Sequence, residues 1–487
     1  MNIVTKKDFI NGSLWKITEQ FLTKGVSLLF SIVLTRMISP DAYGLLALTA
    51  VFTNLSDILI DGGFGTALIR KKDMDDCDIS CVLVVSFSIA LFIYVIMFLA
   101  APAISVYYAE PGLTSVLRVI GLIFFIQAFS AVRTAVVNRN MQFKLLFYCN
   151  FWGTAIAGII GIAIAYFGWG VWALVWQRLL QTTISTVLLI LKMKIQFTFC
   201  FQWKRLKEIF VFSSGVVGAS LINYLSSSLY SLVIGKRYSV VDLGYSEKGA
   251  QLPTQVSLYT FGAMSSVLLP TLASCQADLP RVRRIVKKVV QMTGYLIAPM
   301  MVGLALVSRE VIIILFTDIW LPARPVMEAN CLYYLATPFM LINVQVYYAL
   351  GDSRARLKIE WIRMLLQIMG LLVFGIAAKC SIGQLAWVSA VVAVVSAMIS
   401  FAKVSSMTGY KLREYAKDIC LPLTAALLMG CAVFIMEKIV LIRFAEGEVW
   451  ISLIGKILVG FIIYLFLSIL FKIPGFQEIK HILRRDL

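Results

Sequence analysis

A succession of apolar stretches, each about 20 residues long, constrains the fold of this chain more than any other feature of its sequence. A helix needs about 20 apolar residues to cross a hydrocarbon core of about 30 Å, and only short polar connections separate the stretches. Hydrophobic residues make up 60% of the 487 residues and charged residues 14%, against about 45–50% and about 25% in soluble domains. The sequence therefore predicts an all-α, polytopic membrane protein.

The predicted transmembrane helices number about 14. They lie near residues 12–37, 42–64, 79–101, 112–135, 146–167, 170–191, 209–235, 250–273, 289–307, 326–350, 359–378, 383–404, 419–440 and 449–471. Because their number is even, both ends of the chain are expected on the same side of the membrane.

Lysine and arginine concentrate in alternate connections between these helices. About 29 of the 44 Lys and Arg residues fall on one side and about 9 on the other. The basic groups include Lys6 and Lys7, Arg70 to Lys72, Arg281 to Lys288, and Lys480 to Arg485. Cytoplasmic loops carry such an excess, so both termini are predicted to be cytoplasmic. The net charge of +18 then reflects orientation in a membrane, and no nucleic-acid partner is expected.

Two segments of the chain resemble each other. Thr35 to Gly44 closes the first predicted helix and Lys236 to Tyr245 closes the seventh, and each carries a basic residue, an Asp and a Gly/Tyr pair. Such a repeat is typical of transporters built from two copies of one bundle, with the substrate site between the halves. We therefore expect two six-helix lobes, 1–208 and 209–404, followed by two further helices and a basic tail in 405–487.

The first predicted helix carries a polar stripe that includes Lys16, Glu19 and Lys24 at helical spacing. Charges inside a membrane are costly and usually face a bundle interior or a water-filled cavity. Lys24 lies about 18 Å along the helix from residue 12, close to the membrane midplane. Lys24 and Lys16 are therefore predicted to contact an anionic substrate, and Glu19 is a candidate for ion coupling or gating.

Asp57 and Asp61 share one face of the second predicted helix because they are four residues apart. Asp61 either marks the cytoplasmic end of that helix or takes part in transport. Asp57 lies deeper, and we favour a role in which it carries a coupling proton or cation. Both residues are therefore candidates for coupling or gating.

Arg118 and Arg178 lie about 9 to 12 Å inside the non-cytoplasmic face. With Lys24 they would make the cavity of the N-terminal half cationic, and a guanidinium group suits a diphosphate. The alternative is that each arginine extends its head group to the membrane surface. Lys248 completes the predicted substrate contacts. Lys456, Glu360 and Arg363 are interpreted as residues that reach the surface or pair at i, i+3.

Several signatures of chemistry are missing from the sequence. No G-x-x-x-x-G-K-[ST] phosphate loop occurs, the single histidine is His481 in the basic tail, and the nine cysteines show no metal-ligand spacing. No large hydrophilic loop is present to carry catalytic groups. We therefore expect a transporter with no cofactor and no metal site, and not an enzyme.

Short motifs resemble the polysaccharide transporters, the Wzx-like O-antigen and exopolysaccharide flippases of the multidrug/oligosaccharidyl-lipid/polysaccharide exporter superfamily. The motifs are Ala42-Tyr43-Gly44, Asp61 to Ile69, Phe167 to Leu174, Leu243-Gly244-Tyr245, Leu269 to Leu272, Trp320 to Ala323 and Ala349 to Asp352. Their order covers nearly the whole chain. The chain departs from similar proteins at Ser226 to Tyr230, where those proteins often place Arg and Asp.

The resemblance implies a two-lobed bundle in a bacterial cytoplasmic membrane. Such a bundle moves undecaprenyl-diphosphate-linked oligosaccharide to the outer leaflet, driven by an H+ or Na+ gradient and surrounded by membrane lipids. A polysaccharide polymerase complex is a candidate partner. The alternatives are a multidrug exporter of the same superfamily, a flippase for the peptidoglycan precursor, and a membrane glycosyltransferase or polymerase.

Overall fold

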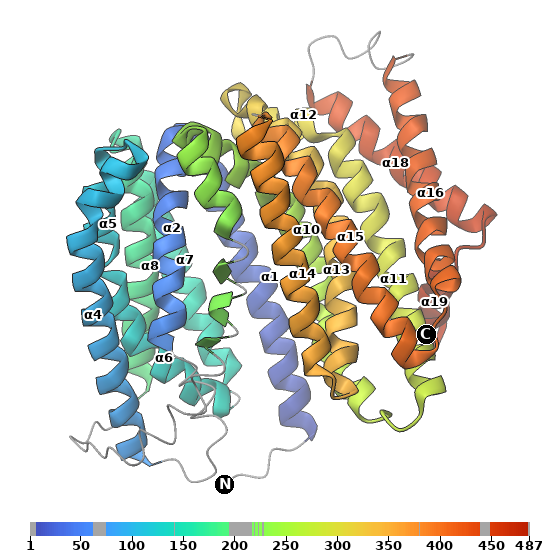
Figure 1. Cartoon of the computed structure of the whole chain (residues 1–487), viewed down its shortest axis with the longest axis horizontal. Coiled ribbons are helices and arrows are strands. Elements are labelled where there is room, and N and C mark those ends of the chain that lie inside the picture. Colours follow the sequence, from blue (N-terminus) through green and yellow to red (C-terminus); the bar gives the residue numbers. More distant parts are fainter. Residues whose placement is uncertain are drawn as a thin grey trace. The chain divides into compact units, whose positions relative to one another are not determined.

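In the computed structural model of this chain, every assigned element is a helix or a helical turn (Figure 1). The structure describes residues 6–61, 75–140, 142–193, 217–218, 220–222, 224–225, 228–378, 380–438 and 449–485. The chain divides into two compact units, Met1–Gly244 and Tyr245–Leu487. Each unit is a bundle of long helices.

Residues 228–237 of the first unit are helical, and seven further helices of this unit have assigned bounds within its described residues. These are α1 (Lys6–Met37), α2 (Pro40–Asp61), α4 (Asp76–Tyr108), α5 (Gly112–Ile120), α6 (Ile123–Arg139), α7 (Phe143–Tyr166) and α8 (Val171–Lys192). Helix α7 packs between α1 and α8, while α4 packs on α5 and α6, and α2 lies against α4, α6 and α8. Phe30 of α1 packs so closely on Gly158 of α7 that a Cβ at Gly158 would lie 2.4 Å from the ring.

The second unit begins within α10 (Val240–Ala273). It continues with α11 (Leu279–Leu306), α12 (Ser308–Phe316), the 3₁₀ turn η1 (Asp318–Ala323), α13 (Arg324–Ala349), α14 (Ser353–Gly370), the π-helical turn η2 (Leu371–Ala377), α15 (Ile382–Thr408), α16 (Leu412–Met436), α18 (Val449–Leu470) and α19 (Pro474–Arg485). Helix α13 packs on α15 and α11, and α16 packs on α11 and α18. The rings of Phe401 and Tyr415 stack at 3.4 Å between centroids in the core of this unit.

Local side-chain chemistry fixes where several of these helices begin and end. Ser381 and Gln384 form a capping box at the start of α15, in which each side chain accepts from the other residue's backbone N–H. Gly409 ends the same helix with φ +70°, a conformation that favours glycine. At the start of α11, Asp278 accepts from the backbone N–H of Arg281 at 3.0 Å.

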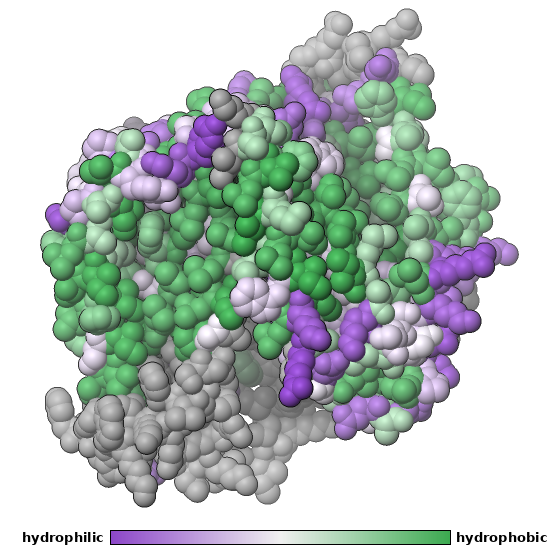
Figure 2. Space-filling view, in the orientation of Figure 1, coloured by the Kyte–Doolittle hydropathy of each residue, from purple (hydrophilic) through white to green (hydrophobic). Residues whose placement is uncertain are grey.

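Nine helices in the described parts of the chain are long and apolar enough to cross a membrane. Their outward faces are apolar, as with Leu99 at 71% and Val106 at 81% exposed on α4 and Phe461 at 68% on α18. Figure 2 shows hydrophobic residues covering much of the visible surface. An apolar surface of this kind suits contact with lipid, so the chain is a multi-pass membrane protein.

Helices also occupy other predicted positions. The spans predicted near 12–37, 250–273, 326–350 and 359–378 correspond to α1, α10, α13 and α14 with η2. The span predicted near 112–135 is interrupted at Gly121 and Leu122, between α5 and α6. The predicted start near 289 is wrong for α11, which begins at Leu279. The prediction was late because the first turns of α11 are basic and a hydropathy pattern does not detect them. The span predicted near 209–235 lies largely outside the described residues.

The two similar segments of the sequence have the same local structure and meet in space. In each, a helix ends, the chain bends at Ile38 or Tyr238, and a new helix starts at Pro40 or Val240. A Cβ on Gly44 would lie 1.8 Å from the carbonyl oxygen of Val240. Reciprocally, a Cβ on Gly244 would lie 2.1 Å from the carbonyl oxygen of Pro40. The starts of α2 and α10 therefore cross with backbone against backbone, which glycine alone permits.

Candidate functional site

Three helices of the first unit bring polar side chains together inside predicted membrane spans. Asp57 lies on α2, Gln127 on α6 and Arg178 on α8. Gln127 is a side-chain hydrogen-bond partner of the Asp57 carboxylate, Arg178 supplies a nearby positive charge, and Asp61 supplies a negative one. The structure thus joins Asp57 and Arg178, which the sequence analysis had assigned to separate roles.

This Asp57 cluster, defined as Asp57, Gln127 and Arg178, is incompletely paired. Within the described part of the chain, the buried Oδ1 of Asp57 and the buried Oε1 of Gln127 have no hydrogen-bond partner. No ion pair within 4 Å involves Asp57 among the described residues. Because buried polar atoms are normally satisfied, these two oxygens are unused hydrogen-bond acceptors, and only the Asp57 carboxylate is also able to take up a proton.

The other cationic candidates of the first unit differ in their surroundings. Lys24 on α1 is exposed. Arg118 is tied to α4, because its Nε donates to the carbonyl of Phe98 at 3.4 Å and its guanidinium carbon lies 4.2 Å from the Phe98 ring centroid. Arg178 is exposed beside the Asp57 cluster. Lys16 and Glu19 lie on α1, but their side chains fall outside the described residues.

Lys248 belongs to the second unit and is enclosed by protein. Its side chain is 5% exposed, its Nζ donates to Oε1 of Gln251 at 3.1 Å, and it lies 5.6 Å from the Phe316 ring centroid. These contacts of Lys248 are with residues of its own unit. Its role in substrate binding stays a prediction.

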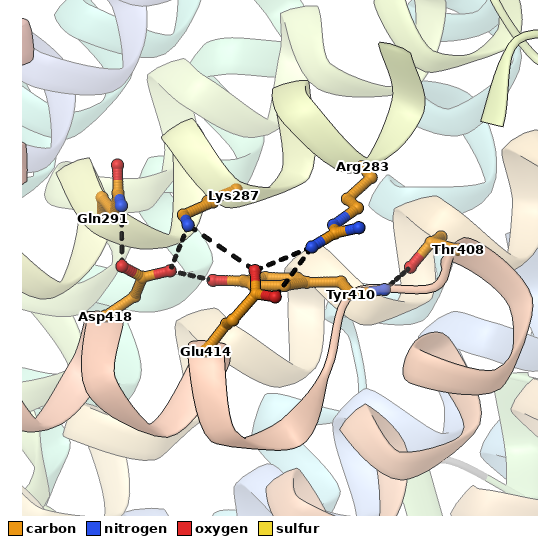
Figure 3. Close-up of polar contacts among 7 residues, drawn as sticks. All are labelled: Arg283, Lys287, Gln291, Thr408, Tyr410, Glu414 and Asp418. Carbon is orange, nitrogen blue, oxygen red and sulfur yellow. Dashed lines mark hydrogen bonds and ion pairs between the residues drawn. The ribbon is translucent and has the colours of Figure 1, made fainter. Parts of the chain in front are cut away.

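The second unit contains a cluster of charges that sequence reasoning missed (Figure 3). Arg283 donates to both carboxylate oxygens of Glu414 at 2.8 and 2.9 Å. Lys287 lies between Glu414, at 3.6 Å, and Asp418, at 3.7 Å. We call Arg283, Lys287, Gln291, Tyr410, Glu414 and Asp418 the α11–α16 cluster.

Asp418 is the most enclosed carboxylate of this cluster, at 7% exposure. Its Oδ1 accepts from Gln291 at 2.7 Å, and its Oδ2 accepts from the Tyr410 hydroxyl and faces Lys287. The signal was present in the sequence as two complementary stripes at i, i+4 spacing, one on α11 and one on α16. The stripes were overlooked because both helices were predicted to begin later.

The interpretation of Lys456 as a residue that reaches the membrane surface is wrong. Its side chain does not reach the surface but is 2% exposed, and it pairs with Glu310 of α12 at 2.8 Å and with Glu437 at the end of α16 at 2.7 Å. The interpretation of Glu360 and Arg363 is confirmed, because they form an i, i+3 ion pair at 3.1 Å. No group of three or more His, Cys, Asp or Glu side chains in the described ranges is arranged to hold a metal ion.

Ionisable side chains inside the membrane spans, as at Asp57 and Lys456, are costly and often mark transport pathways. The family follows from comparison with known proteins. Residues 33–325 match the family model described as polysaccharide biosynthesis protein, and the chain belongs to this family. The resemblance read from the sequence motifs is confirmed.

Curated relatives carry related descriptions. The teichuronic acid biosynthesis protein TuaB of Bacillus subtilis is 23% identical over 384 residues, which cover 78% of this chain and 79% of the relative. The succinoglycan biosynthesis transport protein ExoT of Rhizobium meliloti is 24% identical over 316 residues, 64% of this chain and 63% of the relative. The lipopolysaccharide biosynthesis protein WzxC of Escherichia coli is 21% identical over 344 residues, 66% of each chain.

Solved structures share the fold. The lipid II flippase MurJ, in an inward closed conformation, aligns with a TM-score of 0.75 and 16% identity, over 94% of this chain and 98% of that one. An inward-facing multidrug resistance transporter of the MATE family aligns with a TM-score of 0.63 and 14% identity, over 80% and 96%. The chain therefore is a polysaccharide biosynthesis membrane protein with the fold of these transporters.

Proposed function

We propose that this protein flips an undecaprenyl-diphosphate-linked oligosaccharide from the cytoplasmic to the outer leaflet of a bacterial cytoplasmic membrane. The observation that carries the proposal is the likeness to a lipid II flippase over 94% of the chain, at a TM-score of 0.75. Membership of the polysaccharide biosynthesis family supports a glycan as the cargo. ExoT is described as a transport protein, and this description favours transport of the glycan over its enzymatic modification.

The transport cycle is proposed to use alternating access, in which two lobes rock around a central site. The proposed lobes are residues 1–208 and 209–404, with 405–487 as an appendage. About 14 transmembrane helices are proposed, with both termini in the cytoplasm. A reporter that fluoresces only after export can be fused to either terminus. Fluorescence of that fusion would contradict the proposed orientation.

The Asp57 cluster is the proposed coupling site. A carboxylate with one oxygen free can accept a proton or help to bind Na+, and Arg178 beside it can reach the diphosphate of the cargo. In this scheme, binding of the ion to Asp57 changes the charge that Arg178 faces. Lys24, Arg118, Lys16 and Lys248 remain proposed substrate contacts, and Asp61 and Glu19 remain candidates for gating.

Depletion of the protein in cells provides the direct test of direction. Lipid-linked oligosaccharide is expected to accumulate in the cytoplasmic leaflet when the protein is removed. Accumulation in the outer leaflet would mean that flipping continues without the protein, and the proposal would fail. A complex with a polysaccharide polymerase is proposed to receive the flipped product, and co-purification of the two from membranes would test it.

A second candidate function is export of drugs, because the MATE transporter shares the fold at a TM-score of 0.63. A drug-resistance assay separates the two functions. The described intramembrane cations Lys24 and Arg178 favour an anionic cargo, whereas a drug exporter for cations is expected to use carboxylates. A glycosyltransferase or polymerase is the remaining alternative, and purified protein that extends a lipid-linked sugar would establish it.

A further inference from the structure

The second unit contains a cavity of about 760 Å³ that neither the fold nor the proposed transport cycle explains. Residues of α11, α12, α13, α15, α16 and α18 line it. Leu306, Leu332, Leu335, Trp387, Leu427 and Phe434 form its apolar wall. Trp387, Leu427 and Phe434 are 43%, 52% and 50% exposed, so the wall faces open space and not packed protein. A cavity of this size holds a small amphiphile.

Charged residues also line the same cavity. Arg324 pairs with Glu328 at 2.7 Å, and Lys456 is shared by Glu310 and Glu437. Arg309 and Lys438 are both exposed, and within the described ranges neither forms an ion pair with a carboxylate. The cavity is thus lined by four cations, Arg309, Arg324, Lys438 and Lys456, and three anions, Glu310, Glu328 and Glu437, which leaves a net charge of +1.

We propose that this cavity binds one phospholipid of the surrounding bilayer. Its acyl chain lies along the apolar wall, and its phosphodiester is bound by Arg309 and Lys438. A phosphodiester carries one negative charge and therefore neutralises the excess of +1. The buried Oε2 of Glu310, which accepts no hydrogen bond from the described residues, is an acceptor for a hydroxyl group of the head group.

The charge balance favours a phospholipid over the lipid-linked cargo. A polyprenyl diphosphate carries more than one negative charge, which the single excess positive charge does not balance. The site is lined only by residues of the second unit, and no residue of the Asp57 cluster belongs to it. The inference therefore stands whether or not the proposed flipping activity is correct.

Native mass spectrometry of the purified full-length protein tests the proposal. Delipidated protein is incubated with a phosphatidylglycerol of defined chain length, and retained lipid is counted. The variant Arg309→Ala/Lys438→Ala is expected to bind phosphatidylglycerol at least about tenfold more weakly than the parent protein does, because two charge-assisted contacts are lost. The variant Leu427→Trp, which fills the apolar wall, is expected to lower binding as well.

The matched control is Arg281→Ala/Arg284→Ala, which removes two exposed arginines from the start of α11 in the same unit. Binding that survives in this control but not in Arg309→Ala/Lys438→Ala supports the site. Binding that is equal in all variants would overturn it. Displacement of the phospholipid by a synthetic polyprenyl diphosphate at lower concentration would overturn it in favour of the cargo. Thermal unfolding of each variant identifies loss of binding that results only from loss of fold.

Discussion

Two carboxylates on membrane helices, Asp418 in the second unit and Asp57 in the first, have opposite surroundings. Both oxygens of Asp418 are engaged, by Gln291, Tyr410 and Lys287. One oxygen of Asp57 has no partner among the described residues, and its positive neighbour Arg178 forms no direct ion pair with it. A saturated carboxylate holds helices together, whereas an unsaturated one is available to exchange a proton or bind a ligand. We therefore expect Asp418 to contribute mainly to stability and Asp57 to contribute mainly to transport.

The largest effect is expected from Asp57→Asn, which keeps the shape of the side chain but removes its charge. Energised transport of lipid-linked oligosaccharide into proteoliposomes should fall to the level of empty vesicles, because the proposed coupling site loses its charged group. The free energy of unfolding should change by less than about 1 kcal/mol, since no ion pair is broken. Arg178→Gln is the companion variant, and full transport by both would remove the Asp57 cluster from the mechanism.

Asp418→Ala should show the reverse pattern. It leaves Tyr410 and Gln291 without their buried partner, so the free energy of unfolding should fall by about 3–5 kcal/mol. Thermal unfolding of the detergent-solubilised protein measures this change. Glu414→Gln is the control, because Glu414 is 33% exposed and its solvent-screened pair with Arg283 should contribute much less. Equal losses in the two variants would show that burial does not set the contribution of the α11–α16 cluster.

The Lys456–Glu310 pair is intermediate between Asp418 and Asp57. Lys456 is buried and paired, but one carboxylate oxygen of Glu310 accepts no hydrogen bond from the described residues. Lys456→Met should destabilise the protein by about 3 kcal/mol, since Glu310 then stays buried without a cation. The double variant Lys456→Met/Glu310→Gln should recover most of that loss. A double variant no more stable than Lys456→Met would mean that packing, and not charge, explains the effect.

The smallest effect is expected at Asp352, which caps α14 outside the spans. The backbone N–H of Ala355 and then Lys403 lower the pKa of its carboxyl group. A lowered pKa stabilises the fold above the pKa of the unfolded chain, and this contribution disappears as pH falls through the folded-state value. Asp352→Ala should therefore reduce stability at neutral pH and match the parent protein in acid. A difference that persists in acid would point to another cause.

The positions of many helices follow from hydropathy alone. The stretches predicted near 146–167 and 170–191 became α7 (Phe143–Tyr166) and α8 (Val171–Lys192), because about 20 apolar residues in a row have few other stable arrangements in lipid. The starts of α11 and α16 were predicted too late. Their first turns are charged, and a hydropathy pattern does not reveal a helix that extends beyond the hydrocarbon.

The site was only partly predictable for a different reason. Asp57 and Arg178 are visible in the sequence because charges within apolar stretches stand out. Gln127 is uncharged and gives no such signal. The partners of Lys456 lie 146 and 19 residues away along the chain, so only packing of α12, α16 and α18 identifies them. Charge reveals which residues need partners, but the tertiary fold decides whether they receive them.

The reciprocal contact of Gly44 and Gly244 has a consequence for how this chain can change over generations. Each glycine leaves room for a carbonyl oxygen of the opposite segment, so a larger residue at one position cannot be compensated by a change at the other. If the halves descend from one ancestral gene, their sequences were free to diverge almost everywhere except at this crossing. We expect relatives of this protein to keep glycine at both positions even where the surrounding residues share nothing.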